Sequence, residues 1–350
     1  NQANGRAVQA EAGWPELMGF IMHACQSGEP TAHEAALSVL SHMAPALVDP
    51  AGWAGVGAQL LQLLMAALGD GMAPTVSGAA LEAIAALLTS AADQEGSADS
   101  AGERKKFKAV ANDLQAALPP MLHVLELAVG ASDPDRITDV LSHLSSVAAA
   151  QPRLFKAVLP VVVEGLGQLA TGDMLEPDAR ISCAELLITL AEGAPKMCIK
   201  HNAFIPRMLG ALLPMLLRLG GDLKEWETAT PTDGLREEDY EEEEEKEASY
   251  ACEALERLCE AVGGEPVAKL LLPQLEGMLA PTASWTSRHA ALVAIATVSE
   301  HGSSVIEPHL QQLVTLLLGA AGAGEARLRW ASCYAAALLC DEFPQLTEKM

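Results

Sequence analysis

The sequence predicts an all-α fold, a right-handed α-solenoid of about seven HEAT-type helical pairs. The main observation behind this prediction is a repeat of about forty residues. Short segments that resemble helix beginnings recur along the chain, with anchors at His33, Ser77, Arg136, Arg180, Ser249, Arg288 and Arg329. The steps between these anchors are 44, 59, 44, 69, 39 and 41 residues. A period near forty without strand-like segments is typical of stacked helical pairs.

A second observation is a proline inside an apolar segment before most of the later anchors. These prolines are Pro119, Pro160, Pro214, Pro273 and Pro308. A proline inside a helix removes one backbone hydrogen bond and bends the helix. We therefore expect each unit to contain a kinked first helix (helix A), a short turn, and a second helix (helix B) that begins near the anchor.

The repeat predicts one continuous array over residues 1–350. Its units are expected at about 13–49, 50–92, 103–150, 152–195, 196–264, 265–303 and 304–343. Two of the steps between anchors are long and locate extra residues. We expect residues 91–102 to form a loop between units, and residues 222–247 to form an acidic insertion between the two helices of the fifth unit.

The composition is the third observation, and it argues against catalysis and metal binding. Half of the residues are hydrophobic but only 4% are aromatic, as expected for a core of small and aliphatic side chains. No segment of about 18 apolar residues lacks a charge, so no membrane helix is expected. There is no Cys-x-x-Cys among the seven cysteines, and no two of the nine histidines lie three or four residues apart. We expect no catalytic residues, no cofactor and no metal, and buried reduced thiols in a cytosolic or nuclear protein.

The acidic insertion contains 13 acidic and 3 basic residues, a net charge of −10 within a chain of net charge −24. Two interpretations remain open: a solvated linker that confers solubility, or a polyanion that attracts basic ligands and repels nucleic acid. Its position inside one repeat favours the second. The residues expected to act in this way are Glu237, Glu238, Asp239, Glu241, Glu242, Glu243, Glu244 and Glu245.

The arginines at the beginnings of helices are interpreted first as a structural ladder between repeats and only second as ligand contacts. They are Arg136, Arg180, Arg288 and Arg329. Trp330 is expected in the core, and Trp285 at a partly exposed helix start. The basic cluster at residues 104–108 is interpreted as the solvated start of a helix rather than a localisation signal.

Several segments resemble the importin-β (karyopherin-β) family of nuclear transport receptors. Residues 284–292, SWTSRHAAL, resemble its Asp-Trp-Lys-Tyr-Arg-His-Ala motif, and residues 328–335, LRWASCYA, resemble the repeat that follows. The acidic run preceded by Lys224-Glu225-Trp226 is in the same order as in the family. The chain is most similar to the importin-five (karyopherin-beta-three) branch and would be a central segment of a longer receptor.

The resemblance implies a monomer that shuttles between cytoplasm and nucleus. It implies that basic nuclear-localisation signals of cargo bind to an acidic concave surface and that Ran-GTP controls their release. Nucleoporins are further expected partners, and neither nucleic acid nor membrane is expected to bind. On the helices after the insertion, we expect five residues on the concave surface to hold cargo lysines: Glu253, Glu256, Glu260, Trp285 and Glu300. The first three lie at i, i+3 and i+7, on one stripe of a helix.

The alternative function is a structural scaffold with no transport role. A tubulin-binding array would need basic turns, so the acidic charge of this chain disfavours it. A scaffold would also have no evident use for an acidic insertion. An enzyme is a weaker alternative, because no catalytic constellation is present. The sequence does not identify the cargo.

Overall fold

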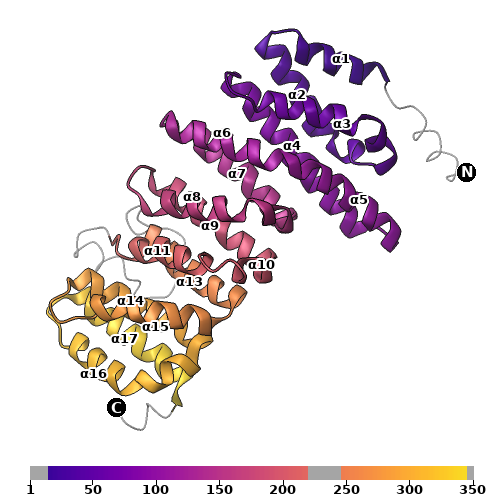
Figure 1. Cartoon of the computed structure of the whole chain (residues 1–350). Coiled ribbons are helices and arrows are strands. Elements are labelled where there is room, and N and C mark those ends of the chain that lie inside the picture. Colours follow the sequence, from indigo (N-terminus) through magenta and orange to yellow (C-terminus); the bar gives the residue numbers. More distant parts are fainter. Residues whose placement is uncertain (1–14, 220–245, 345–350) are drawn as a thin grey trace, which may run out of the picture. The chain divides into compact units, whose positions relative to one another are not determined.

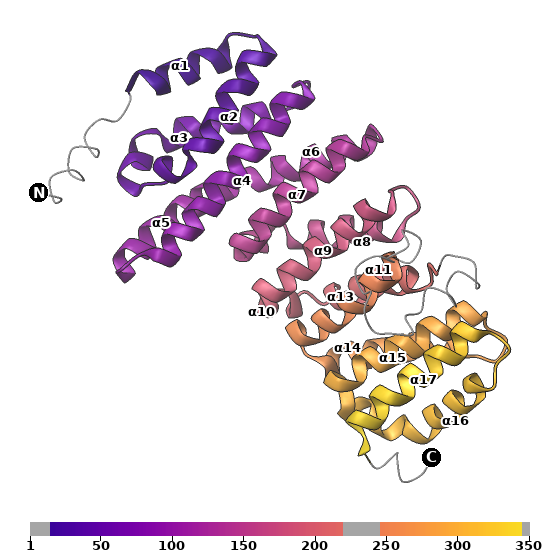
Figure 2. The same cartoon turned by 180° about the vertical axis from the view of Figure 1, so that it is seen from behind.

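The computed structural model describes residues 15–219 and 246–344, and every regular element in these ranges is helical (Figure 1). The predicted all-α class is therefore confirmed for the described residues. The chain divides into two compact units, residues 1–155 and residues 156–350, called here the N-terminal and C-terminal units. In each unit the helices are stacked as neighbouring pairs, which Figure 2 shows from behind.

The described residues of the N-terminal unit form three helical pairs. Helix α4 packs against both α2 and α7, and α2, α4 and α7 each pack on a partner, α1, α3 and α6 respectively. The bounds are Pro15–Gln26 (α1), Pro30–Leu47 (α2), Pro50–Ala67 (α3), Pro74–Ser97 (α4), Ala101–Leu114 (α5), Leu118–Gly130 (α6) and Pro134–Ala150 (α7). A short 3-10 turn, Gln115–Ala117, joins α5 to α6, and Pro152–Ala157 forms another after α7.

In the C-terminal unit, residues 156–219 and 246–344 form four helical pairs in two layers. The A layer consists of Leu159–Thr171 (α8), Phe204–Leu216 (α11), Gly264–Met278 (α14) and Leu310–Ala321 (α16). The B layer consists of Pro177–Gly193 (α9), Lys246–Val262 (α13), Trp285–Ile306 (α15) and Ala326–Glu342 (α17), and successive B helices are in contact. Two short elements complete the unit, Pro195–Ile199 (α10) and the 3-10 turn Glu307–His309.

Every anchor of the forty-residue repeat lies in the first turn of a helix. Arg136 is the third residue of α7, and each of the other six anchors is the fourth residue of its helix. In α2, α4, α7 and α9 the first residue is a proline. Proline is favoured at that position because its missing N–H group has no partner in a helix and its φ angle is already helical. The repeat in the sequence is therefore the recurring start of the second helix of each pair.

The predicted kink at each repeated proline is wrong for three of the five positions. Pro119 and Pro160 lie in the first turn of α6 and α8, and Pro308 lies in a 3-10 turn, where no intrahelical hydrogen bond is lost. Only Pro214 and Pro273 lie inside a helix. In three repeats, proline thus marks where the helix begins rather than where it bends.

The predicted loop at residues 91–102 is also wrong over most of its length. Helix α4 continues to Ser97, and α5 begins at Ala101, where Ser100 caps it by accepting a hydrogen bond from the backbone N–H of Glu103 at 3.1 Å. The Gly- and Ser-rich composition suggested a loop. Packing of α4 against α5 supports helix in spite of that composition, because tertiary contacts override weak intrinsic propensities.

Helix α4 is the one described helix that is long and apolar enough to cross a membrane by length and composition. Most of it is buried, and it packs against α2, α5 and α7. Burial of this kind is expected of the central helix of a stack, which is hydrophobic on all sides.

Candidate functional site

The outer face of helix α13 carries the predicted acidic stripe. Ala251, Ala254, Leu255, Leu258 and Cys259 are buried on the inner face of this helix. Glu253, Glu256 and Glu260 are exposed on the opposite side. The helix is thus amphipathic, and its packing against the A layer leaves the three carboxylates in solvent on the outer face of the B layer.

Three B helices together form a hollow on this face, which we call the acidic hollow. Its volume is about 360 Å³. It is lined by Cys252 and Glu256 of α13, by Ala296, Thr297, Ser299 and Glu300 of α15, and by Tyr334, Leu338, Asp341 and Glu342 of α17. Four carboxylates therefore line one concavity, and no Lys or Arg from residues 15–219 or 246–344 lines it.

The carboxylates of Glu256 and Glu300 are close to each other although they come from different helices. One oxygen of each and one ring nitrogen of His301 lie within 4.8 Å of one another. This is the one such group among the described residues that brings three potential metal-ligand atoms together. Both glutamates are exposed, so the group suits an ammonium or guanidinium ion as well as a metal ion.

A second, more apolar hollow adjoins the first, and we call it the aromatic hollow. Its volume is about 420 Å³, and Cys252 and Tyr334 line both hollows. The ring of Trp330 stacks on Tyr334 with centroids 5.2 Å apart and on His289 with centroids 5.9 Å apart. The other residues that line it are Leu216, Leu219, Ala248, Ser249, Val293 and Arg327.

Both tryptophan predictions are tested by this arrangement. Trp330 was expected in the core but is 43% exposed at the surface of the B layer, where its ring stacks on those of His289 and Tyr334. Trp285 lies at the start of α15 and is partly exposed, as expected, yet it lines neither hollow. Trp330 and Tyr334 therefore replace Trp285 as the aromatic residues beside the carboxylates.

Burial shifts the pKa values of two groups that line the hollows, His289 and Cys252. Desolvation by burial and, to a smaller extent, the nearby charge of Arg327 together lower the pKa of His289 to about 4, so this imidazole is neutral at physiological pH. Burial also raises the pKa of the Cys252 thiol, which lies 3.2 Å from Thr297 Oγ1. The thiol is therefore protonated, and the negative charge at the site comes from the carboxylates alone.

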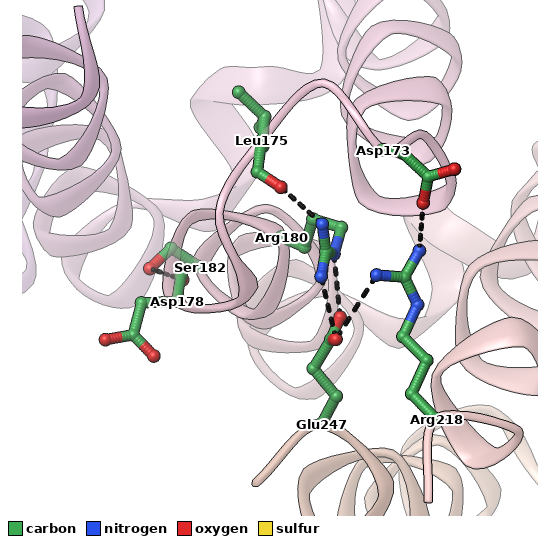
Figure 3. A network of polar contacts seen from close by, with 7 residues as sticks. All are labelled: Asp173, Leu175, Asp178, Arg180, Ser182, Arg218 and Glu247. Atoms are coloured by element: carbon green, nitrogen blue, oxygen red, sulfur yellow. Dashed lines mark hydrogen bonds and ion pairs between the residues drawn. The ribbon is translucent and has the colours of Figure 1, made fainter. Parts of the chain in front are cut away.

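A buried ion pair joins α9 to the first turn of α13, as Figure 3 shows. Arg180 donates from Nε to Oε1 of Glu247 at 2.7 Å and from Nη2 to Oε2 at 2.8 Å, and both side chains are 6% exposed. Arg180 also donates to the carbonyl oxygen of Leu175. Arg218 lies beside the pair, 3.4 Å from Glu247 and 2.7 Å from Asp173. Hydrogen bonds to Glu247 raise the pKa of Arg180 above its ordinary value.

This pair corrects one boundary of the predicted acidic insertion. Lys246 and Glu247, assigned to residues 222–247, are the first two residues of α13, and Glu247 is buried. The structural role of Glu247 could not be recognised from composition, because this residue follows a long run of acidic residues. The other predicted residues of that run, Glu237, Glu238, Asp239 and Glu241 to Glu245, lie outside the described residues.

A second set of ion pairs joins the same two helices near the middle of α13. Arg257 lies 2.9 Å from both carboxylate oxygens of Glu185 and 2.7 Å from Glu192, both on α9. Glu253 is 3.8 Å away on α13 itself, and the hydroxyl of Tyr250 donates to Glu185 at 3.0 Å. Sequence reasoning missed Arg257, although its place four residues after Glu253 was a visible signal.

The predicted arginine ladder is therefore only partly present. Arg180 forms an ion pair across repeats, whereas Arg136 donates instead to the hydroxyl of Ser77 at 3.0 Å. Within the described part of the chain, Arg288 has no ion-pair partner. Arg329 is exposed and donates to the carbonyl oxygens of Ala323 and Gly324 in its own loop. In α17 the buried arginine is Arg327, two residues earlier, so the helix presents a different residue to its neighbour.

Comparisons with known proteins agree with the resemblance seen in the sequence. A family profile described as IPO5-like, TPR repeats matches residues 6–165, and one described as an importin repeat matches residues 173–269. Importin subunit beta-3 of Saccharomyces cerevisiae is 22% identical over 340 residues, which are 96% of this chain and 28% of that relative.

Solved structures of a karyopherin have the same fold. Kap121p bound to the SUMO protease Ulp1p matches with a TM-score of 0.77 and 22% identity, over 97% of this chain and 30% of that chain. Kap121p bound to RanGTP matches with a TM-score of 0.74 and 22% identity, over 95% and 29%. This chain thus spans less than a third of the length of these relatives. The two profiles cover most of it, and the chain belongs to the importin (karyopherin-β) family.

Proposed function

We propose that this chain is a segment of a nuclear import receptor that binds Lys- or Arg-rich signals of cargo on the outer face of its C-terminal B layer. The observation that supports this most is the acidic hollow. Four carboxylates from three successive B helices line it, and none of its lining residues is a lysine or arginine. Carboxylates gathered in a concavity repel one another, and a guest cation relieves that repulsion.

The two hollows suit different parts of one basic peptide. The acidic hollow offers Glu256 and Glu300 to an ammonium or guanidinium group. Beside it, Trp330 offers a 43% exposed ring against which the aliphatic stem of a lysine or arginine can lie.

Release of cargo by Ran-GTP and shuttling between cytoplasm and nucleus form the second part of the proposal. They are supported by the family and by the solved complex of Kap121p with RanGTP, which resembles this chain in fold. We expect Ran-GTP to displace a bound basic peptide from the receptor and Ran-GDP to leave it bound. Fluorescence anisotropy of a labelled peptide measures both outcomes.

The acidic run before α13 has a supporting role in this proposal. Replacement of residues 237–245 by a Gly/Ser linker should slow the capture of a basic peptide at low salt. The loss should shrink at high salt, because the Debye length falls to about 3 Å at 1 M. Unchanged capture kinetics at low salt would favour the solubility linker.

The binding site itself is tested by a charge-matched pair of double variants. Glu256→Gln with Glu300→Gln removes two charges from the acidic hollow. Glu276→Gln with Glu307→Gln removes two exposed charges that line neither hollow. We expect the first variant to bind a Lys-rich peptide at least about tenfold more weakly, about 1.4 kcal/mol, and the second to bind almost normally. Equal losses in the two variants would indicate attraction by net charge alone and would argue against a defined site.

A further inference from the structure

The outer face of the B layer has two acidic junctions, and they differ in one respect. Between α13 and α15 the carboxylates of Glu256 and Glu300 line an open hollow. Between α9 and α13 the carboxylates of Glu185, Glu192 and Glu253 surround the guanidinium of Arg257. Among the described residues, no lysine or arginine lines the first junction, whereas the second already holds one arginine.

The contacts of Arg257 are those expected of a guanidinium ion bound as a ligand. Its guanidinium donates to both oxygens of Glu185 and to both oxygens of Glu192, at distances of 2.7 to 3.1 Å. Bidentate geometry of this kind is the strongest that a guanidinium forms with a carboxylate. These hydrogen bonds, with Glu192 contributing most, raise the pKa of Arg257 above its ordinary value. Its side chain is 23% exposed, so the pair lies at the surface that a peptide would reach.

We propose that Arg257 is a built-in substitute for a cargo cation, and that it determines where the peptide-binding groove ends. By occupying the acidic site between α9 and α13, it confines a basic peptide to the junctions formed by α13, α15 and α17. This inference rests on the proposed function, because it assumes that the neighbouring acidic hollow takes cargo cations. Arg257 is thus a specificity-determining residue that acts by excluding a guest.

The remaining contacts between α9 and α13 allow the site to persist without Arg257. Arg180 and Glu247 form their buried bidentate pair at the start of α13, and Tyr250 donates to Glu185 at 3.0 Å. Lys246 lies 2.6 Å from Asp178 on α9. With these contacts in place, Arg257→Ala should leave Glu185 and Glu192 facing an unfilled cation site rather than separate the helices.

The spacing of the helices determines how long a peptide must be to reach the site that Arg257→Ala opens between α9 and α13. Packed helices lie about 8–10 Å apart, and an extended peptide advances about 3.3 Å per residue. A peptide that fills the acidic hollow therefore needs about three more residues, ending in a lysine or arginine, to reach the α9–α13 junction. Peptides extended at either end should be used, since either direction of binding is compatible with the two sites.

The first experiment uses N-methylguanidinium as a probe and does not depend on cargo. In the full chain, millimolar N-methylguanidinium should raise the melting temperature of Arg257→Ala relative to wild type, because it refills the site. The stabilisation in excess of that of wild type should vanish when Glu185→Gln and Glu192→Gln are added. Lys269→Ala, which removes a cation from an exposed helical pair on α14, is the matched control and should respond no more than wild type, whose acidic hollow can also bind the probe. Absence of a selective response in Arg257→Ala would overturn the inference.

The second experiment compares a short peptide of alternating Lys and Ala with the extended versions. Wild type should bind all of them with similar affinity. Arg257→Ala should bind one extended version about fivefold or more tightly than wild type does, while its affinity for the short peptide stays unchanged. If wild type binds the short peptide and Arg257→Ala gains nothing from any extension, this inference fails and the proposed function stands. If wild type does not bind the short peptide at all, the proposed function fails, and the role of Arg257 in cargo selection fails with it.

Discussion

At the scale of single residues, the effects of charged groups depend on how deeply they are buried. The side chains of Arg180 and Glu247 are 6% exposed, and Arg218, the other described ion-pair partner of Glu247, lies farther away at 3.4 Å. A buried pair contributes little compared with an apolar pair of the same shape, but removal of one member leaves an uncompensated charge. The sequence predicted Arg180 as a ladder residue from its position. It did not predict Glu247, because nothing in a run of glutamates distinguishes the one that the fold buries.

Removal of one member of this pair should therefore destabilise the C-terminal unit strongly. We expect Arg180→Ala to lower the free energy of unfolding by about 3–5 kcal/mol, because the buried Glu247 then loses its closest described partner and keeps the longer contact to Arg218. Arg180→Met combined with Glu247→Leu should recover much of that loss. Urea denaturation followed by circular dichroism measures both variants. A single variant as stable as wild type would contradict the assigned burial.

The lowered pKa of His289 predicts loss of stability in acid. This group has a pKa of about 4 in the folded chain and an ordinary value of 6.5. Between these two pH values the unfolded chain binds more protons than the folded chain. The stabilisation associated with neutral His289 is therefore fully present above pH 6.5 and is lost as the pH falls to about 4. The loss amounts to about 3 kcal/mol. In His289→Gln the fall of the urea midpoint between pH 7 and pH 4.5 should be shallower, and an equally steep fall would contradict the prediction.

At the scale of elements, the places where helices begin were easier to predict than their shapes. The anchors predicted the second helix of each pair because segments that resemble helix beginnings recur about every forty residues, in the first turn of that helix. Kinks and loop lengths were harder, because packing of α4 against α5 or of α14 against α15 is invisible in local sequence. One such contact, between α14 and α15, affects the geometry of the acidic hollow. Helix α15 bends at Gly302, just after Glu300 and His301, and Gly264 of α14 packs there.

This close approach of two backbones predicts opposite effects for two glycines of α14. A Cβ atom on Gly264 would lie 2.0 Å from the carbonyl oxygen of His301, whereas one on Gly277 would meet nothing within 4 Å. We expect Gly264→Ala to destabilise by at least about 1–3 kcal/mol and to weaken peptide binding, because the bend that positions Glu300 must shift. Gly277→Ala should be neutral or stabilising by about 0.5–1 kcal/mol. Equal stabilities of the two variants would contradict the assigned packing.

At the scale of the whole molecule, the chain combines a stack of small local cores with a strong negative charge. Each of its two units has its own buried leucines, alanines and valines. The repeat and the composition were sufficient to predict the fold class, and the resemblance of residues 284–292 and 328–335 to importin-β motifs predicted the family. The hollows were not predicted, since Glu256, Glu300 and Asp341 meet only when three helices separated by tens of residues stack together.

The repeat architecture predicts unfolding in more than one step. Repeat stability is a sum of local terms and contacts between neighbouring repeats, so the two units should lose structure at different denaturant concentrations. Circular dichroism and tryptophan fluorescence should then give transitions that do not coincide, because Trp53 reports on the N-terminal unit and Trp330 on the C-terminal unit. A single sharp transition seen by both probes would contradict this expectation.

The central claim is that the outer face of the C-terminal B layer holds the cations of a basic import signal. The most direct test is a crystal structure of this chain with a Lys-rich peptide bound. The account predicts a lysine or arginine nitrogen of the peptide within 4 Å of the Glu256 or Glu300 carboxylate, the salt-bridge distance for such groups, with the side-chain stem beside Trp330. A peptide bound to the A layer or to the N-terminal unit, with the acidic hollow empty, would contradict it.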